Sequence, residues 1–444
     1  MFESMCQFGK ERFLKGREGV FSFDLLSSAV PILMGIYIFI NPFPHMTAIK
    51  GICLYLSFVL VCSLLIVKKI DFSFRTPLLV PFCLFIGWVL YGLFFAVDKE
   101  NSIHDFHAHL LRYVAIYFII INFFNSRRQL ISLARVIVAS STVYSIGGLI
   151  YFYLVLGHDW TTRFSYAETG LMGCEVLGNS ICALVIFSIL LSLNFCMNKE
   201  PLRGKVILLS CLIPQTVLVF LVQSRGAFIA LFLSLMLILW KNKKTLMLML
   251  LILLIVVATV LPVKDALTVD DFLKNPRVKV WLSTLAVVKD YPTVGIGFGN
   301  ETYRDKLDLM MYNNRLPQEY RQRKGYIVGA PHNIFLNILV RTGYLGLALF
   351  LSIIVVFFWM CGRCALRGED DFIRRWGVCM GAAILSFLVI GMFEQMFHHV
   401  TELVLYTIFA MGTIVWKLYS SMSGDTVPVI DTDSRITGII GGNQ

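Results

Sequence analysis

The chain has little charge for its length. Only 15% of its 444 residues are Asp, Glu, Lys or Arg, whereas 57% are hydrophobic and the mean hydropathy is +0.74. Runs of eighteen or more apolar residues recur from end to end, which a soluble core does not need. These runs lack strict alternation, which excludes a transmembrane barrel, so the spans must be helices. The sequence therefore predicts an all-α polytopic integral membrane protein.

Other features are missing as well. We find no internal repeat, no soluble domain and no small-residue cleavage site behind the first apolar run. Residues 1–24 are polar and basic and are expected to form a retained cytoplasmic tail. Residues 419–444 have little apolar content and are expected to be a disordered cytoplasmic tail. The net charge of +11 does not indicate a nucleic-acid partner in such a chain, because its distribution matters more than its sum.

The eleven cysteines do not predict a disulfide framework. Most lie inside apolar runs, where cysteine behaves as a small hydrophobic residue. Cys361 and Cys364 have a spacing seen in redox and metal sites. The pair stands alone at a helix end, so we expect neither function there.

Hydropathy predicts about twelve membrane spans. They are 25–43, 48–67, 77–97, 110–124, 130–156, 176–197, 205–222, 226–240, 245–262, 332–361, 373–393 and 398–418. The first nine make up residues 25–262 and the last three residues 332–418. The breaks at 223–226 and near Glu394 fit either a kink or a true loop.

Positive charge predicts the orientation. Every second connection is basic, whereas the alternate short connections 43–47, 98–109, 157–175 and 394–397 are nearly bare of Lys and Arg. The positive-inside rule therefore places both termini in the cytoplasm. The large polar segment 263–331, with eleven basic and eight acidic residues, then lies in the periplasm. Long loops on a helical scaffold commonly carry function, so we expect the catalytic residues there.

The loop contains a predicted helix that begins after Asn275 and ends before Pro292. An N-cap asparagine with proline at the first helical position favours this start. Apolar residues at helical spacing are expected to form its buried face: Val278, Trp281, Leu285 and Val288. Arg277 lies in the first turn, where the helix dipole disfavours a cation, so it should have an anionic partner. The following segment 295–300 has three glycines, which allow a tight turn and close approach of the backbone to a ligand.

These motifs, in this order, resemble the O-antigen ligase/polymerase (Wzy-like) superfamily. The resemblance is specific over about 225–346, and the predicted topology extends it over nearly the whole chain. It rests on Ser224-Arg225-Gly226, Arg277 with Trp281, Gly295-x-Gly297-x-Gly299, Pro331-His332-Asn333 through Leu336, Gly343 and Gly346.

The resemblance implies a GT-C-type architecture with one large periplasmic loop. It also implies an inverting, metal-independent glycosyltransferase in the inner membrane of a Gram-negative bacterium, with no cofactor. The donor would be a glycan on undecaprenyl diphosphate. In the ligase branch the acceptor is a sugar hydroxyl of the lipid A–core oligosaccharide. The other partner is membrane lipid.

The residues themselves also indicate which side chains could carry out this reaction. A sugar hydroxyl that attacks an anomeric carbon needs a base near neutral pKa, and His332 at the loop-to-membrane junction is our candidate. The diphosphate leaving group needs cations, and arginine binds phosphate with two parallel hydrogen bonds. Arg225 and Arg277 are the main diphosphate candidates, with Arg341 and Arg163 as weaker ones.

A group of metal-ligand types remains: His104, Asp105, His107 and His109, with Glu394, His398 and His399 on the same side. Their spacings match no standard zinc site, and we expect an interfacial polar cluster without a metal.

Three alternatives to a ligase stay open. Two belong to the same superfamily, an O-antigen polymerase and a protein O-oligosaccharyltransferase. The third is a secondary transporter, although the sequence shows no matched pair of interrupted helices.

Overall fold

The computed structural model describes residues 18–164, 180–197, 202–240, 275–322 and 327–423, together with 244 and 247. Within this part of the chain the regular structure is helical throughout. Seven helices are long and apolar enough to cross a membrane, and four further apolar helices are shorter. The polytopic membrane class predicted from the sequence is therefore confirmed.

The helices of the bundle are numbered in chain order. The first group is α2 (Glu18–Ile40), α3 (Thr47–Ile66), α4 (Leu79–Leu93), α5 (Lys99–Asp105), the π-helix η1 (Phe106–Leu111), α6 (Arg112–Phe123), α7 (Arg127–Leu149) and the π-helix η2 (Ile150–Val155). The second group is α8 (Cys182–Cys196), α9 (Leu202–Leu221), α10 (Arg225–Leu239), α16 (Ile334–Arg367), α17 (Asp371–Gly391) and α18 (His399–Ser423). The large loop contains α13 (Pro276–Asp290), α14 (Thr302–Asp305), α15 (Leu309–Asn314) and the short 3₁₀ helix η5 (Gln318–Tyr320).

These apolar helices coincide with all the predicted spans except 245–262, which lies outside the described residues. Several boundaries differ from the prediction: α2 begins at Glu18, inside the predicted tail 1–24, and α16 continues to Arg367, past the predicted end of its span at 361. The fourth span, predicted as 110–124, begins at Lys99, because the polar first turns of this helix carry no hydropathy signal. α18 continues to Ser423, past the predicted start of the tail at 419. The two uncertain breaks are true interruptions: Gln223 has φ 50° between α9 and α10, and residues 392–398 connect α17 to α18.

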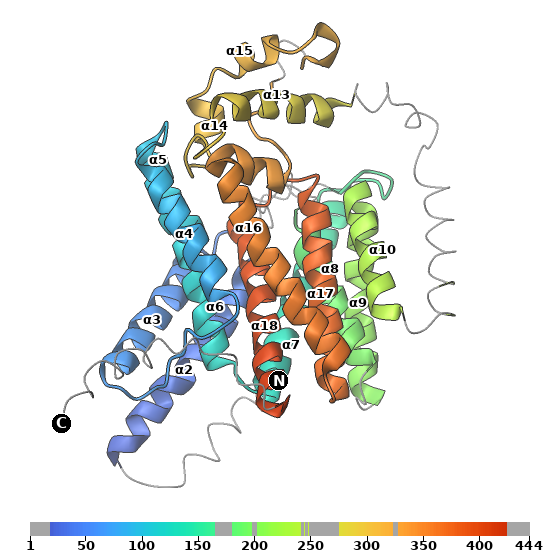
Figure 1. Ribbon diagram of the computed structural model, residues 1–444. Coiled ribbons are helices and arrows are strands. Elements are labelled where there is room, and N and C mark those ends of the chain that lie inside the picture. The colour runs from blue at the N-terminus through green and yellow to red at the C-terminus, as the bar shows by residue number, and fades with distance from the viewer. Residues whose placement is uncertain are drawn as a thin grey trace, which may run out of the picture.

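The described helices form one bundle, with α13, α14 and α15 lying over one end of it (Figure 1). The first turn of α2 and the last turn of α18 lie at the opposite end. α18 and α17 are the most enclosed of the candidate spans, with 83% and 72% of their apolar windows buried. α3 is at the edge, with 28% buried, and packs chiefly on α2.

α13 forms as predicted. Asn275 caps it by accepting a hydrogen bond from the Arg277 backbone N–H, and Pro276 takes the first helical position. The predicted buried face is only partly right, since Val278 and Val288 are buried whereas Leu285 is 37% exposed. α13 packs on both α15 and α16. Its buried surface therefore differs from the single apolar face that the spacing predicted.

α16 is bent at Gly343, which has φ 71° and ψ −175°. A bend of this kind leaves backbone groups without helical partners, and inside a membrane protein these need other partners. The carbonyl groups of Val340 and Arg341 accept from Ile296 and Gly297. The Tyr344 N–H donates to the carbonyl of Pro292 at 2.9 Å. The loop segment 292–297 thus takes over the hydrogen bonds that the bend breaks.

The glycines of segment 295–299 approach the protein itself. A Cβ on Gly295 would lie 2.3 Å from the Arg341 carbonyl carbon, and one on Gly297 would lie 2.6 Å from Ser102 Oγ. On Gly299 it would lie 2.0 Å from Asn101 Oδ1. The expected tight turn is present, but the close approach that these glycines allow is to α16 and α5 and not to a ligand.

Candidate active site

His332 lies where the large loop re-enters the bundle. Its φ of 47° is in the left-handed region, and its side chain is 27% exposed. The next residue, Asn333, caps α16 through the backbone N–H groups of Phe335 and Leu336. Asn333 also donates to the carbonyl of Met392 at 3.1 Å, which ties this turn to the end of α17. A strained backbone fixed by its surroundings is typical of functional sites.

Glu394 connects His332 with Arg277. Its side chain is 6% exposed, and Oε1 accepts from Arg277 Nη2 at 2.8 Å. Oε2 lies 3.8 Å from His332 Nδ1, which is too long for a hydrogen bond but allows an electrostatic attraction to a protonated imidazole. The dipole argument predicted an anionic partner for Arg277, and the protein supplies one. Arg277 is still 43% exposed, and its Nε and Nη1 make no hydrogen bond to a described residue.

Phe393 brings the start of α10 to the same place. Its ring centroid lies 5.9 Å from the guanidinium carbon of Arg277, and its Cδ2 lies 2.9 Å from where a Cβ on Gly226 would be. Glycine at 226 therefore lets α10 approach the α17–α18 connection closely. Ser224 caps α10, and the neighbouring Arg225 is exposed, with no hydrogen bond or ion pair to a described residue.

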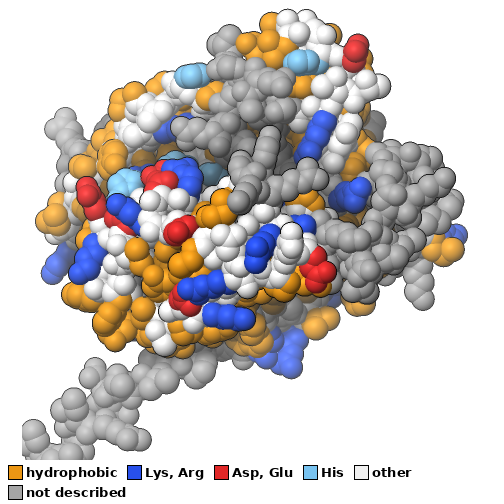
Figure 2. All heavy atoms as spheres, turned by 90° about the horizontal axis from the view of Figure 1, so that it is seen from above, with side chains coloured by type: hydrophobic (Ala, Val, Ile, Leu, Met, Phe, Trp, Pro, Cys, Tyr) orange, Lys and Arg blue, Asp and Glu red, His pale blue; other side chains and the backbone are white. Residues whose placement is uncertain are grey.

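We call Arg225, Arg277, His332, Phe393 and Glu394 the junction cluster. Its members come from the starts of α10, α13 and α16 and from the α17–α18 connection, so segments far apart in sequence meet here. Figure 2 shows this side of the molecule, where Lys and Arg side chains lie among apolar and uncharged ones. The cluster combines a partly exposed imidazole, two partly exposed guanidinium groups and one buried carboxylate. Such a set can accept a proton and stabilise a phosphate-bearing leaving group.

Arg163 lies beside the turn that precedes Arg225. Its Nε donates to the carbonyl of Val222 at 2.9 Å, and the Phe164 N–H donates to the carbonyl of Leu221. The segment before 165 is thereby held on the end of α9. The Arg163 side chain is exposed, and its assignment to the diphosphate stays a prediction. Segment 165–179, which follows it, lies outside the described residues.

Arg341 is in a different environment. It is 3% exposed and lies between the rings of Phe298 and Phe397, with its guanidinium carbon 4.1 and 4.8 Å from their centroids. Asp105 Oδ2 is 3.9 Å away, and the three side-chain nitrogens have no hydrogen-bond partner among the described residues. Its role as a diphosphate ligand also stays a prediction. In this structure Arg341 is enclosed below the segment 295–300.

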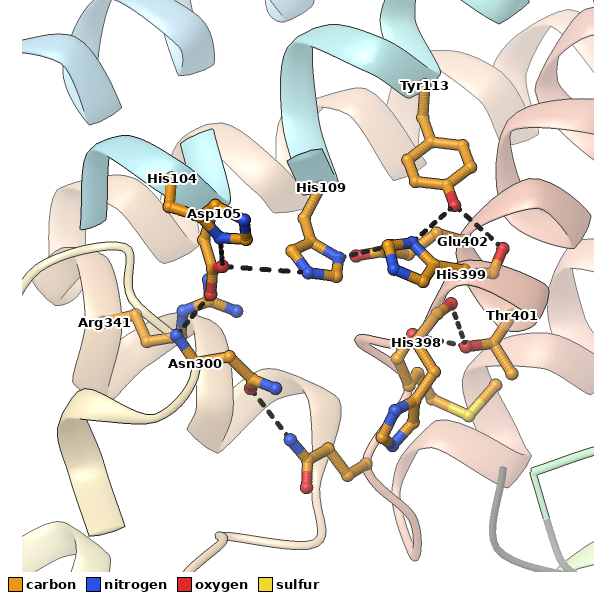
Figure 3. A network of polar contacts seen from close by, with 12 residues as sticks. His104, Asp105, His109, Tyr113, Asn300, Arg341, His398, His399, Thr401 and Glu402 are labelled. Carbon is orange, nitrogen blue, oxygen red and sulfur yellow. Dashed lines mark hydrogen bonds and ion pairs between the residues drawn. The ribbon is translucent and has the colours of Figure 1, made fainter. Parts of the chain in front are cut away.

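A polar network extends from Asp105 into the bundle (Figure 3). Asp105 accepts from the Asn300 backbone N–H at 2.6 Å and lies 3.8 Å from His109 Nε2. His109 Nδ1 lies 2.7 Å from Glu402 Oε2. The hydroxyl of Tyr113 lies 3.1 Å from His399 Nδ1. Part of the expected group therefore forms a polar cluster, which continues into the bundle through Glu402, 3% exposed, whereas Glu394 belongs to the junction cluster instead.

Part of this network has metal-ligand chemistry. One ligand atom from each of His109, His399 and Glu402 lies within 4.8 Å of the others. The two imidazole rings stack with their centroids 4.9 Å apart and 8° between their planes. A metal ion binds in the plane of an imidazole, so one ion cannot lie in both of these stacked planes. As arranged, the three residues form a hydrogen-bonded network, and the absence of a metal stays a prediction.

Two residues of these clusters were not recognised from the sequence. Glu402 could have been found, because an acid inside a predicted membrane span is itself a signal of function. Phe393 gives no such signal, since one phenylalanine at the end of an apolar run resembles any other.

A family model described as O-antigen ligase matches residues 207–351. The matched segment contains α10, the described part of the large loop and the bend in α16, and thus Arg225, Arg277 and His332. No curated protein matches the chain. The chain thus carries an O-antigen ligase family domain over residues 207–351, consistent with the superfamily that the sequence motifs resemble.

Proposed function

We propose that this protein is an O-antigen ligase of a bacterial inner membrane. It transfers O-antigen polysaccharide from undecaprenyl diphosphate to a sugar hydroxyl of the lipid A–core oligosaccharide, at the periplasmic face. The observation that carries the proposal is the junction cluster, which joins His332 to Arg277 through Glu394 within a chain that matches the ligase family model. We assign it a metal-independent, inverting reaction on a GT-C-type scaffold.

His332 acts as the general base in this proposal. It removes the proton from the acceptor hydroxyl while that oxygen attacks the anomeric carbon of the donor glycan. The bond from this carbon to the diphosphate oxygen breaks, and the diphosphate leaves with the electron pair. Because the His332 side chain is 27% exposed, it is open to an acceptor from outside the bundle.

Arg277 and Arg225 receive the charge of the leaving diphosphate. Arg277 keeps two side-chain nitrogens for this purpose while it donates to Glu394, and Arg225 is exposed at the start of α10, next to the glycine that approaches Phe393. Hydrogen bonds between a guanidinium group and a phosphate are charge-assisted and favour two-point binding. Their contribution should be largest as negative charge develops on the leaving oxygen.

Glu394 fixes the position of Arg277 relative to His332. Its carboxylate holds Arg277 and lies beside the imidazole that becomes positively charged when His332 takes the proton. An adjacent carboxylate stabilises such an imidazolium and keeps the ring oriented. We therefore assign Glu394 a positioning role and not proton transfer to or from the substrate.

The function is tested by deleting the gene and analysing both lipid pools. A ligase deletion should leave lipid A–core without long polysaccharide, while long glycan accumulates on undecaprenyl diphosphate. Accumulation of single repeat units on the carrier would instead identify a polymerase. Unchanged lipopolysaccharide would contradict both assignments and would favour a protein acceptor or transport.

A further inference from the structure

A second cationic site lies away from the junction cluster, in a groove of about 500 Å³ between α3 and the helix formed by α5, η1 and α6. Tyr55 and Phe58 of α3 line one wall. His104, His107 and Arg112 lie on the other wall, together with apolar residues of η1. α3 packs on α2 and makes no comparable contact with η1 or α6, so the two walls stay apart.

Arg112 is the unusual residue of this groove. It lies within the continuous helix Lys99–Phe123, which is one of the candidate membrane spans. An arginine in such a position is costly and normally has a partner. Arg112 is half-buried, yet it makes no hydrogen bond or ion pair with any described residue.

The nearby carboxylates are already engaged elsewhere. Asp105 is 5% exposed at its side chain and interacts with His104, Asn300 and Arg341. Glu402 is 3% exposed and pairs with His109. Figure 3 shows both carboxylates within the polar network, on either side of His109. Among the described residues, the groove therefore presents Arg112 and the exposed His107 without an ion pair to an acidic side chain.

The other wall has the character of a lipid-contacting surface. α3 has the low burial of an edge helix and a mean hydropathy of 2.3. Tyr55 is 61% exposed, and its neighbours Ile52 and Val59 are 63% and 59% exposed. A ligand of this groove thus meets hydrogen-bond donors and positive charge on one side and aromatic and aliphatic surface on the other.

We propose that this groove binds a phosphate-bearing membrane lipid, with the phosphate on Arg112 and His107 and the acyl chains along α3. Guanidinium groups favour phosphate because they supply parallel, charge-assisted donors. The apolar wall favours an attached lipid over a free anion. None of the groove residues belongs to the junction cluster, so the site is independent of the proposed transfer reaction.

Native mass spectrometry of the full chain in detergent tests this proposal. The protein is titrated with dioleoylphosphatidylglycerol and with dioleoylglycerol, which has the same chains but no phosphate. We expect the phosphate lipid to bind more tightly, and Arg112→Gln to weaken its binding about tenfold or more because charge-assisted hydrogen bonds are lost. Arg112→Lys should retain only part of the binding, because an ammonium group keeps the charge but loses the parallel donors.

Arg367→Gln is the control, because Arg367 also lies on an apolar helix and, like Arg112, makes no ion pair with a described residue. It should bind as the wild type does. Equal binding of the two lipids, or equal loss in both glutamine variants, would overturn the proposal. The proposal would also be overturned if inorganic phosphate, at the same concentration as the lipid, displaced the lipid from the protein. If Arg112→Gln does not fold, Tyr55→Ala on the exposed wall should still reduce binding severalfold, and unchanged binding would again overturn it.

Discussion

At the scale of single residues, the candidate site depends on one buried carboxylate that faces two cationic side chains. Glu394 is almost fully enclosed, and its two oxygens face Arg277 and His332. Removing its charge while keeping its shape should therefore disturb both the base and the leaving-group contact.

Glu394→Gln should lower the turnover number of purified enzyme about tenfold to a hundredfold, the size expected for one charge-assisted contact. KM for the acceptor should change less, because Glu394 does not face the acceptor in our assignment. Glu394→Asp should recover part of the rate. A glutamine variant with normal kcat would show that the carboxylate only supports the fold.

Arg277→Lys tests the diphosphate contact. Lysine keeps the charge but loses the planar fork, so it cannot donate to Glu394 and also bind the phosphate through two parallel hydrogen bonds. We expect a loss of about 2–4 kcal/mol in transition-state stabilisation, measured as a fall in kcat/KM. If Arg277→Lys and Arg225→Lys both keep near-normal kcat/KM, the diphosphate is bound elsewhere.

At the scale of elements, the bend in α16 joins the large loop to the bundle. Gly343 has positive φ, and a Cβ there would lie 1.8 Å from the carbonyl oxygen of Thr293. The bend thus requires glycine, and the loop segment that follows α13 depends on the bend for its hydrogen bonds.

Gly343→Ala should destabilise the protein by at least about 2 kcal/mol through backbone strain alone, with the collision adding to it. Thermal unfolding in detergent measures this as a clear fall in Tm. Gly362→Ala, in the same helix, has nothing within 4 Å of its Cβ position and should leave Tm unchanged or slightly raised. Equal Tm values for the two variants would show that the bend is not required.

The loop is also held by an ion pair between Asp290 at the end of α13 and Arg315 after α15, with distances of 2.8 and 2.9 Å. The hydrogen bond from Arg315 lowers the pKa of Asp290 below its ordinary value. This contribution is therefore complete above the ordinary carboxyl pKa of about 4 and is lost as pH falls through the lowered value.

The protection of α15 against hydrogen exchange, measured relative to the intrinsic exchange rate at each pH, should accordingly fall below about pH 4. Asp290→Asn should show the faster exchange at all pH values and lose this pH dependence. A wild-type α15 whose protection is independent of pH in this range would exclude the ion pair as its support.

At the scale of the whole molecule, the sequence predicted what depends on composition and local patterns. Apolar runs located the described spans, and Asn275 with Pro276 located the start of α13. Partners that tertiary packing brings together could not be predicted in the same way. The partner of Arg277 lies 117 residues away, and the exposure of Leu285 depends on the position of α15.

The predicted orientation can be tested with single cysteines in a cysteine-free background. Asn314 is exposed on the large loop, and Arg367 is exposed at the far end of α16. A membrane-impermeant thiol reagent added to the periplasm should label Asn314→Cys but not Arg367→Cys. Gln322, on the same loop, is unsuitable for this purpose because it is buried and hydrogen-bonded. The reverse labelling pattern would show that the large loop lies in the cytoplasm and would contradict the catalytic assignment.

The most direct test of the account is the single-turnover rate of His332→Asn. Asparagine tolerates the left-handed backbone at this position and forms hydrogen bonds, but it cannot accept a proton at neutral pH. We predict that transfer falls by about 10²–10⁴-fold while the lipid-linked donor still binds, because binding depends on the arginines and the lipid. A folded His332→Asn enzyme that joins donor to acceptor at the wild-type rate would contradict this account.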